Sequence, residues 1–203
     1  MTAERNALSR RSFLAGAAAC TAACGLGLLP SMASAAEAAA KKGGNMLIIY
    51  FSHSGNTKAV AEMIQKKTGA DIIELKTVTP YPKDYNAVVE MAEKEKKSNA
   101  RPAIATELPN LDKYDTIFLG YPNWWGTIPM AYCTLLEKYD LGSRIVIPFV
   151  THGGSAFGSS LKDLKRLCPK ARFKDGFEVK GSRAASAQAA VDKWLSKLGL
   201  AAE

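Results

Sequence analysis

The sequence predicts an α/β domain built on a parallel β-sheet with helices on both faces. From residue 46 onward, short apolar runs alternate with amphipathic stretches, a pattern typical of strands joined by right-handed helical crossovers. The short runs are apolar at nearly every position, as expected for strands buried on both faces. A length of 203 residues with 47% apolar and 23% charged residues suits one globular domain with a sizeable core.

The N-terminal segment is predicted to lie outside this domain. Ser-Arg-Arg-Ser-Phe-Leu at 9–14 precedes an alanine-rich apolar run to Leu29, and small residues follow at Ala33 and Ala35. This order resembles a twin-arginine export signal cut after Ala35, and the apolar run is short for a membrane-spanning helix. An uncleaved membrane anchor is the alternative. The predicted boundaries are a signal peptide at 1–35, a flexible leader at 36–45 and a folded domain at 46–203.

Loss of this signal would leave a mildly basic protein in the periplasm or cell envelope. The full chain has a net charge of +8, and the signal holds three arginines and one glutamate, so the cleaved protein carries +6. The lysines are scattered, and no stripe of basic residues with interleaved aromatics predicts nucleic-acid binding. The charge suits an acidic partner protein or peripheral contact with an anionic membrane.

The four cysteines divide between the signal and the domain. Cys20 and Cys24 lie in the signal, where a lipoprotein anchor is a less favoured alternative. Cys133 and Cys168 remain, and an oxidising compartment favours disulfides. Their places near the start of one expected helix and at the end of the next put them roughly a helix length apart, beyond the ~7 Å Cα limit for a bridge. Both are expected to be unpaired and buried.

The first elements follow from apolar spacing. A near-continuous apolar run predicts a strand at 46–51. Apolar residues then recur at helical spacing over 57–69, which predicts a helix that ends at Gly69. A second strand is expected at 71–76, with Ile72, Ile73 and Leu75 as its apolar positions.

The segment 77–112 has a looser pattern. A Pro-Tyr-Pro turn at 80–82 precedes a charged amphipathic helix at 84–97. The side chains expected on its inward face are Tyr85, Val88, Val89 and Ala92. The insertion, with Tyr81 and Tyr85, either covers a site or simply packs on the domain.

The alternation then resumes to the C-terminus. The third strand is expected at 116–121, and the fourth at 144–150 contains Pro148, which removes one ladder donor. A short fifth strand is expected at 176–179. Helices are expected at 130–139, 159–168 and 184–198, the last with Val191, Trp194, Leu195 and Leu198 inward.

Unusual loops follow the first, third and fourth strands. Because the carboxyl ends of parallel strands share one edge of a sheet, these loops should lie together. Their sequences are Ser52-His53-Ser54-Gly55-Asn56-Thr57, Pro122-Asn123-Trp124-Trp125-Gly126, and Thr151-His152-Gly153-Gly154 with Phe157 shortly after.

The loop at 52–57 has the features of a phosphate cradle. It offers three hydroxyls and a side-chain amide, and Gly55 lets the backbone approach a ligand closely. A helix starting near Thr57 adds unpaired N–H groups and the positive end of its dipole. Neither a Walker loop nor a dinucleotide fingerprint is present. The alternative is an ordinary turn in which the serines cap the helix.

Together the three loops resemble those of flavodoxins and flavodoxin-like quinone reductases, over roughly residues 46–198. The resemblance implies a doubly wound five-stranded parallel sheet of order 2-1-3-4-5, with FMN at its switch point. It implies that Ser52, Ser54, Gly55, Asn56 and Thr57 hold the phosphate, that Pro122, Asn123, Trp124, Trp125 and Gly126 line the isoalloxazine, and that Thr151, His152, Gly153, Gly154 and Phe157 approach its far edge.

The chemistry of the residues agrees with this assignment. A flat ring system needs an aromatic face and backbone amides, which the two tryptophans and the glycine pair provide. The alternatives are tryptophans that serve only the core and a glycine pair that is only a flexible turn. His53 is expected to face solvent within the phosphate loop, whereas His152 is the candidate for contact with flavin or substrate. Two histidines do not favour a metal site, and no hydrolytic triad or carboxylate pair is apparent.

The function these features predict is flavin-dependent electron transfer by an exported protein. The partner would be a redox protein or a membrane quinol. One alternative is an NAD(P)H-dependent quinone reductase, and another is a flavodoxin-fold binding module without redox turnover.

Overall fold

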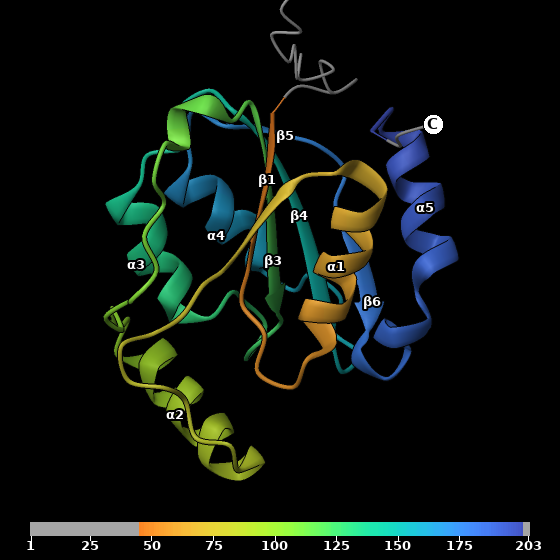
Figure 1. The fold of residues 1–203 in the computed structure, drawn as a ribbon. Coiled ribbons are helices and arrows are strands. Elements are labelled where there is room, and N and C mark those ends of the chain that lie inside the picture. Colours follow the sequence, from red (N-terminus) through yellow and green to blue (C-terminus); the bar gives the residue numbers. More distant parts are fainter. Residues whose placement is uncertain (1–44, 201–203) are drawn as a thin grey trace, which may run out of the picture. The chain divides into compact units, whose positions relative to one another are not determined.

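The computed structural model describes residues 45–200, which form a parallel β-sheet with helices on both faces (Figure 1). The predicted signal at 1–35 and the leader up to residue 44 lie outside the described residues. The sheet has the order β2-β1-β3-β4-β5, with β6 also paired to β4, and every pairing is parallel. The strands are β1 (Met46–Tyr50), β2 (Asp71–Glu74), β3 (Thr116–Pro122), β4 (Ile145–His152), β5 (Arg172–Phe173) and β6 (Phe177–Lys180). The predicted fold class and strand order are confirmed.

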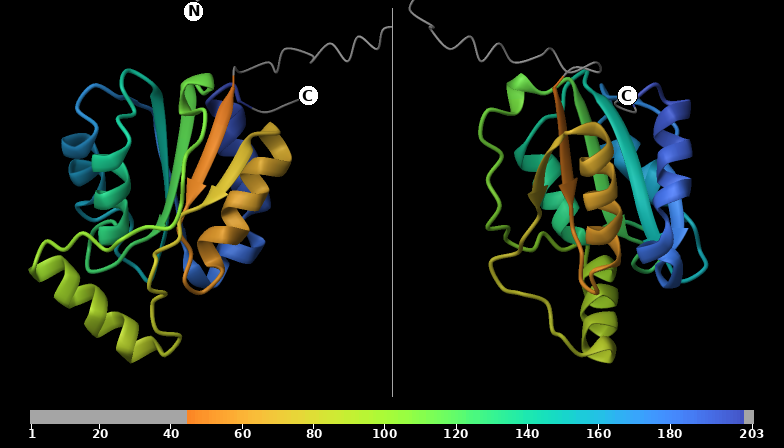
Figure 2. Two further views of the ribbon diagram at one scale, coloured as in Figure 1. Left: turned by 60° about the vertical axis from the view of Figure 1, so that its left-hand side comes forward. Right: turned by 45° about the vertical axis from the view of Figure 1, so that its right-hand side comes forward.

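Helices α1 and α5 cover one face of the sheet, and α3 and α4 cover the other (Figure 2). Helix α2 lies beyond the carboxyl ends of the strands (Figures 1 and 2). The helices are α1 (Asn56–Thr68), α2 (Tyr85–Lys97), α3 (Met130–Lys138), α4 (Ser160–Leu167) and α5 (Gln188–Lys197), with 3-10 turns η1 (Leu111–Lys113) and η2 (Gly181–Ser186). None of the helices within 45–200 has the length and apolar character needed to cross a membrane.

Two hydrophobic cores lie on opposite faces because side chains alternate along each strand. Ile48 and Phe118 belong to the core under α1 and α5, whereas Ile49 and Leu119 belong to the core under α3 and α4. All four are fully buried. The pattern explains why the strand segments are apolar at consecutive positions.

The fully buried Tyr132 attaches α3 to the site end of the sheet. Its hydroxyl lies 3.0 Å from the carbonyl oxygen of Ile49 and 2.7 Å from that of Gly120. Burial raises the pKa of this phenol well above its ordinary value, so it stays a neutral donor. The contact fixes the ends of β1 and β3, from which two of the site loops start.

One strand at 176–179 was expected beside β4, but two short strands occupy this edge of the sheet. Strand β5 pairs with Ile145 and Val146 of β4, and β6 pairs with the segment from Phe149 to His152. Along β4, Ile145 donates to Asp115 on the β3 side, whereas the Val146 carbonyl accepts from Lys174 on the β5 side. Successive residues of β4 thus direct their backbone groups to opposite sides, and Pro148, like Val146, faces the β5 and β6 side. It lies opposite the gap between these two short strands, so no ladder bond needs its missing N–H.

Two further details of the elements were predicted wrongly. The last helix does not begin at Ala184, because Gly181–Ser186 is a 3-10 turn and α5 starts at Gln188. Tyr85 does not point inward, since it is 75% exposed. Cys133 and Cys168 are free and buried as expected, and burial raises the pKa of the Cys168 thiol to about 11.

Candidate functional site

The three predicted loops meet at the carboxyl edge of the sheet, around Thr151. The hydroxyl oxygens of Thr57 and Thr151 lie 2.8 Å apart in a buried hydrogen bond, which joins the start of α1 to the end of β4. The backbone N–H of Asn123 donates to the Thr151 carbonyl oxygen at 2.8 Å, which joins the loop after β3 to the same residue. The predicted clustering of the loops is confirmed.

The loop at 52–57 ends in an open helix N-terminus. Gly55 is the N-cap of α1 with a φ of +85°, a conformation that costs glycine little. No side chain caps α1, and its first turn holds no acidic residue. The alternative in which the serines cap this helix is therefore wrong. The first N–H groups of α1 remain available to an anion.

One buried polar atom in each of the three loops lacks a hydrogen-bond partner. These atoms are Ser52 Oγ, Asn123 Oδ1 and His152 Nδ1, and no other buried side-chain nitrogen or oxygen within residues 45–200 is left unpaired. Buried polar groups in native proteins are almost always satisfied, because an unpaired one costs free energy. Their concentration in the three loops suits a site whose ligand supplies the missing partners.

A cavity of about 420 Å³ lies between two of these loops and α2. The end of β3 and the first part of the loop after it contribute residues 122–126, and the phosphate loop contributes His53 and Ser54. Ser155 closes the side next to β4. From α2 the lining side chains are Tyr85, Val88, Val89 and Ala92. The cavity is thus aromatic and apolar on two sides and polar toward the phosphate loop.

The two tryptophans form a tight turn at the edge of this cavity. Trp124 and Thr127 exchange backbone hydrogen bonds of 3.0 and 3.1 Å, and the two residues between them, Trp125 and Gly126, have φ values of +52° and +82°. Trp125 is 46% exposed, and its indole N–H donates to the carbonyl oxygen of Val89 at 3.0 Å. Both rings line the cavity, so the core-only alternative does not describe them.

A flavodoxin family model matches residues 45–198 of this sequence. The chain belongs to the flavodoxin family. Among solved structures, a candidate flavoprotein of Bacteroides eggerthii is 31% identical, with a TM-score of 0.68 over 77% of this chain and 98% of that chain. A candidate flavoprotein of Bacteroides uniformis is 28% identical, with a TM-score of 0.68 over 76% and 99% of the two chains.

A flavoprotein in complex with FMN, from Lactobacillus acidophilus, is more distant. It is 24% identical, with a TM-score of 0.61 over 74% of this chain and 98% of that chain. A search of curated proteins found no match. The likenesses extend over nearly the full length of these structures, so this flavodoxin-family chain has the same fold as they have.

The residues of the third loop, which the resemblance places at the far edge of a flavin, have different surroundings. Thr151 uses its hydroxyl for Thr57, and Phe157 packs against the core under α3 and α4. Neither lines the cavity between the loops and α2. Gly153 and Gly154 are exposed and have open space around them, whereas Ser155, which the sequence did not single out, lines the cavity.

The two histidines occupy unlike places in this flavodoxin-family fold. His53, expected to face solvent, is only partly exposed: its ring nitrogen Nε2 donates to the Pro82 carbonyl oxygen at 2.7 Å, and its ring lies against Trp124. His152 is 7% exposed and its Nε2 contacts the Glu178 carboxylate on β6. His152 alternates with Thr151 along β4, so its side chain points to the face opposite α1.

Helix α2 supplies the site residues that the sequence alone did not assign to a ligand. Val88, Val89 and Ala92 line the cavity, and the Lys96 ammonium donates to the carbonyl oxygen of Trp125 at 2.5 Å. The helical spacing of apolar residues over 84–97 predicted an inward face, but it did not predict which part of the protein that face contacts. Helix α2 of this insertion therefore forms one side of the cavity.

Proposed function

We propose that this chain binds FMN at the three loops and acts as an electron-transfer flavoprotein outside the cytoplasm. The observation that carries the proposal is the set of unpaired buried atoms, one in each loop: Ser52 Oγ, Asn123 Oδ1 and His152 Nδ1. Membership of the flavodoxin family and similarity to candidate flavoproteins support it. The proposed export rests on the twin-arginine pattern at residues 9–14.

The phosphate of FMN would lie at the N-terminus of α1. The free N–H groups there, the Thr57 hydroxyl and the Ser52 hydroxyl would donate to its oxygens, and the helix dipole favours a dianion. No lysine or arginine occurs between residues 52 and 57. Affinity for the phosphate would therefore come from hydrogen bonds to backbone and hydroxyl groups.

The isoalloxazine would occupy the cavity of about 420 Å³ between the loop after β3 and α2. Trp124 and Trp125 offer aromatic surface, while Val88, Val89 and Ala92 exclude water from the side of α2. When bound, FMN supplies one- or two-electron transfer, which the side chains alone cannot provide. The role of this chain is then to hold the flavin, shield it and present one edge to a partner.

The test is the binding of FMN and of riboflavin to the full chain. FMN should bind far more tightly than riboflavin, because only FMN has the phosphate that α1 and its loop receive. In Thr57→Ala, loss of a charge-assisted hydrogen bond of about 1.5–3 kcal/mol should weaken FMN by about one to two decades. Riboflavin affinity should change little, and Thr57→Ser, which keeps the hydroxyl, is the matched control.

Two outcomes would overturn the proposal. The first is a purified protein that shows no flavin absorbance and takes up none from added FMN. The second is equal affinity for FMN and riboflavin, which would remove the phosphate loop from the site.

A further inference from the structure

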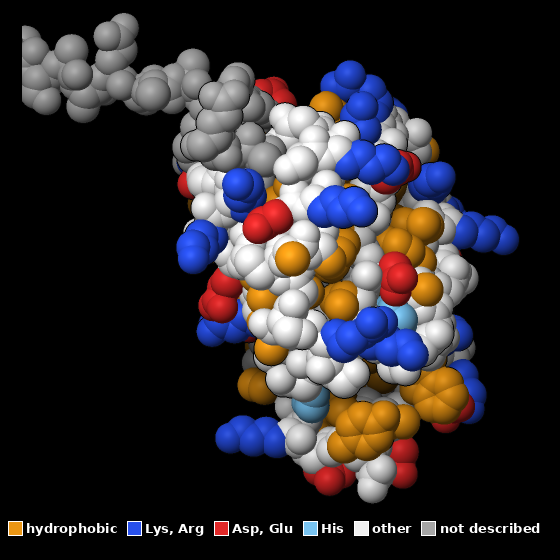
Figure 3. Space-filling view, turned by 90° about the vertical axis from the view of Figure 1, so that its right-hand side faces the viewer, with side chains coloured by type: hydrophobic (Ala, Val, Ile, Leu, Met, Phe, Trp, Pro, Cys, Tyr) orange, Lys and Arg blue, Asp and Glu red, His pale blue; other side chains and the backbone are white. Residues whose placement is uncertain are grey.

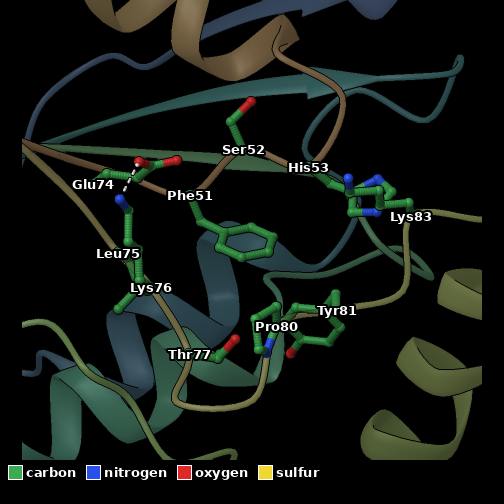
Figure 4. A pocket seen from close by; sticks show the side chains of 10 residues that line it. All are labelled: Phe51, Ser52, His53, Glu74, Leu75, Lys76, Thr77, Pro80, Tyr81 and Lys83. Carbon is green, nitrogen blue, oxygen red and sulfur yellow. Dashed lines mark ion pairs between the residues drawn. The ribbon is translucent and has the colours of Figure 1, made fainter.

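A second cavity, of about 320 Å³, lies on the β2 side of the phosphate loop. Figure 4 shows its lining, which comes from the end of β1 and from the segment that follows β2. The ring of Phe51 and the side chains of Pro80 and Tyr81 lie on one side of it (Figure 4). Glu74 and Lys76 form an ion pair at one end, and His53 and Lys83 lie toward the other (Figure 4).

An aromatic wall separates this second cavity from the candidate flavin cavity. The ring of Trp124 meets those of Phe51 and Tyr81 edge to face, at centroid distances of 5.3 and 5.1 Å, and the latter two rings are 5.5 Å apart. Phe51 and Tyr81 face the second cavity, whereas Trp124 faces the first. His53 lines both cavities. The second cavity therefore adjoins the proposed flavin site, and Ser52 and His53 of the phosphate loop also line it.

The charges around the second cavity leave one cation unbalanced. The Lys76 ammonium lies 3.3 Å from the Glu74 carboxylate, so these two charges offset each other. Lys83 has no ion-pair partner within the described part of the chain, residues 45–200. The Tyr81 hydroxyl donates to Glu95 at 2.8 Å, and burial with this contact raises the pKa of the phenol. Tyr81 thus offers a neutral, fixed ring.

We infer that this cavity is a second ligand site, for a planar aromatic anion. Its ring would pack on Phe51 and Tyr81, where aromatic pairs gain beyond simple burial, and its acidic group would lie at Lys83. The inference goes beyond the proposed FMN site and does not depend on it, because none of these contacts needs the flavin.

The experiment is an NMR titration of the full chain with anthraquinone-2-sulfonate, with and without FMN. Amide shifts are expected over residues 77–83 in both samples. Lys83→Met should weaken binding by about fivefold, the size of a partly exposed ion pair, and the difference should shrink at high salt. The matched control is Lys193→Met, because Lys193 is exposed on α5 and lies outside the cavity.

A second pair of variants tests the aromatic contact. Tyr81→Phe keeps the ring and should retain binding, whereas Tyr81→Leu should weaken it. Unchanged binding in both Lys83→Met and Tyr81→Leu would overturn the inference. So would displacement of the probe by FMN, which would place it in the flavin cavity and leave the proposed function intact. Shifts at 77–83 in a protein that takes up no FMN would support the second site and refute only the proposed function.

Discussion

Ser52 has a buried hydroxyl oxygen with no hydrogen-bond partner. Such a group normally costs stability, and a protein tolerates the cost where the group serves a ligand. Figure 4 shows this side chain turned away from Phe51, toward α1. Removal of this hydroxyl should therefore preserve or raise the stability of the protein while it weakens ligand binding.

We expect Ser52→Ala to leave the flavin-free protein equally stable or more stable by up to about 1 kcal/mol, because an unsatisfied polar atom is removed. The same change should weaken FMN by about one to two decades, because the ligand loses a donor to its phosphate. Urea unfolding without flavin and an FMN titration measure the two effects. Ser196→Ala on the exposed face of α5 is the control and should change neither. A Ser52→Ala protein that loses stability and keeps its FMN affinity would contradict this assignment.

The sequence predicted those features of single residues that depend on their neighbours along the chain. The conformation of Gly55 and the open start of α1 follow from six consecutive residues. The environment of His53 does not, because its partner Pro82 is 29 positions away and comes from the insertion. For His152 the loop was predictable, but the face of the sheet to which the ring turns was not, since that depends on where β4 ends.

Two hydrogen bonds join helix α2 to the turn after β3. The Trp125 indole N–H donates to Val89, and the Trp125 carbonyl accepts from Lys96. Trp125 has a φ of +52°, a left-handed conformation that is unfavourable for a bulky residue and persists where the surroundings enforce it. These contacts make α2 the element that fixes the shape of the candidate flavin cavity.

Loss of the Lys96 contact should therefore loosen α2. In Lys96→Met, amide hydrogen exchange over Tyr85–Lys97 should accelerate by up to about tenfold, which corresponds to the free energy of one hydrogen bond. Exchange of the amides in the sheet should stay unchanged. Lys94→Met is the matched control, since Lys94 is exposed on the same helix and does not line the cavity. Equal exchange in the two variants would show that Lys96 does not hold the helix to the turn.

Strands and helices could be told apart in the sequence because the spacing of apolar residues differs between them. The errors fall on segments that are too short to show a spacing. Arg172–Phe173 is a strand of two residues, too brief to have a period. The turn at Gly181–Ser186 is helical but of the 3-10 kind, which the same residues do not distinguish from the start of α5. Pro148 argued against a central strand, but β5 and β6 leave a gap opposite it, so no neighbouring strand needs its missing N–H.

The chain has side chains of both charges with a basic excess, 27 lysines and arginines against 19 aspartates and glutamates. On the face in Figure 3, lysine and arginine side chains are spread from one end to the other with acidic side chains between them. The full chain carries +8. A scattered excess of this kind raises the rate of encounter with an acidic surface without specifying a docking geometry.

The choice of electron donor depends on the compartment in which the protein works. If the protein is exported, soluble NAD(P)H is expected to be scarce around it, and a membrane quinol or a redox protein at the membrane is the more suitable donor. We expect slow reduction of the FMN-loaded protein by NADPH and faster reduction by anionic vesicles that contain quinol. The vesicle reaction should slow as ionic strength rises, because the screening length shortens to about 8 Å at physiological salt. Anaerobic stopped-flow absorbance measures both rates, and neutral vesicles with the same quinol are the control for the charge effect. Rapid reduction by free NADPH, with no salt dependence at the vesicles, would instead favour a nicotinamide-dependent quinone reductase.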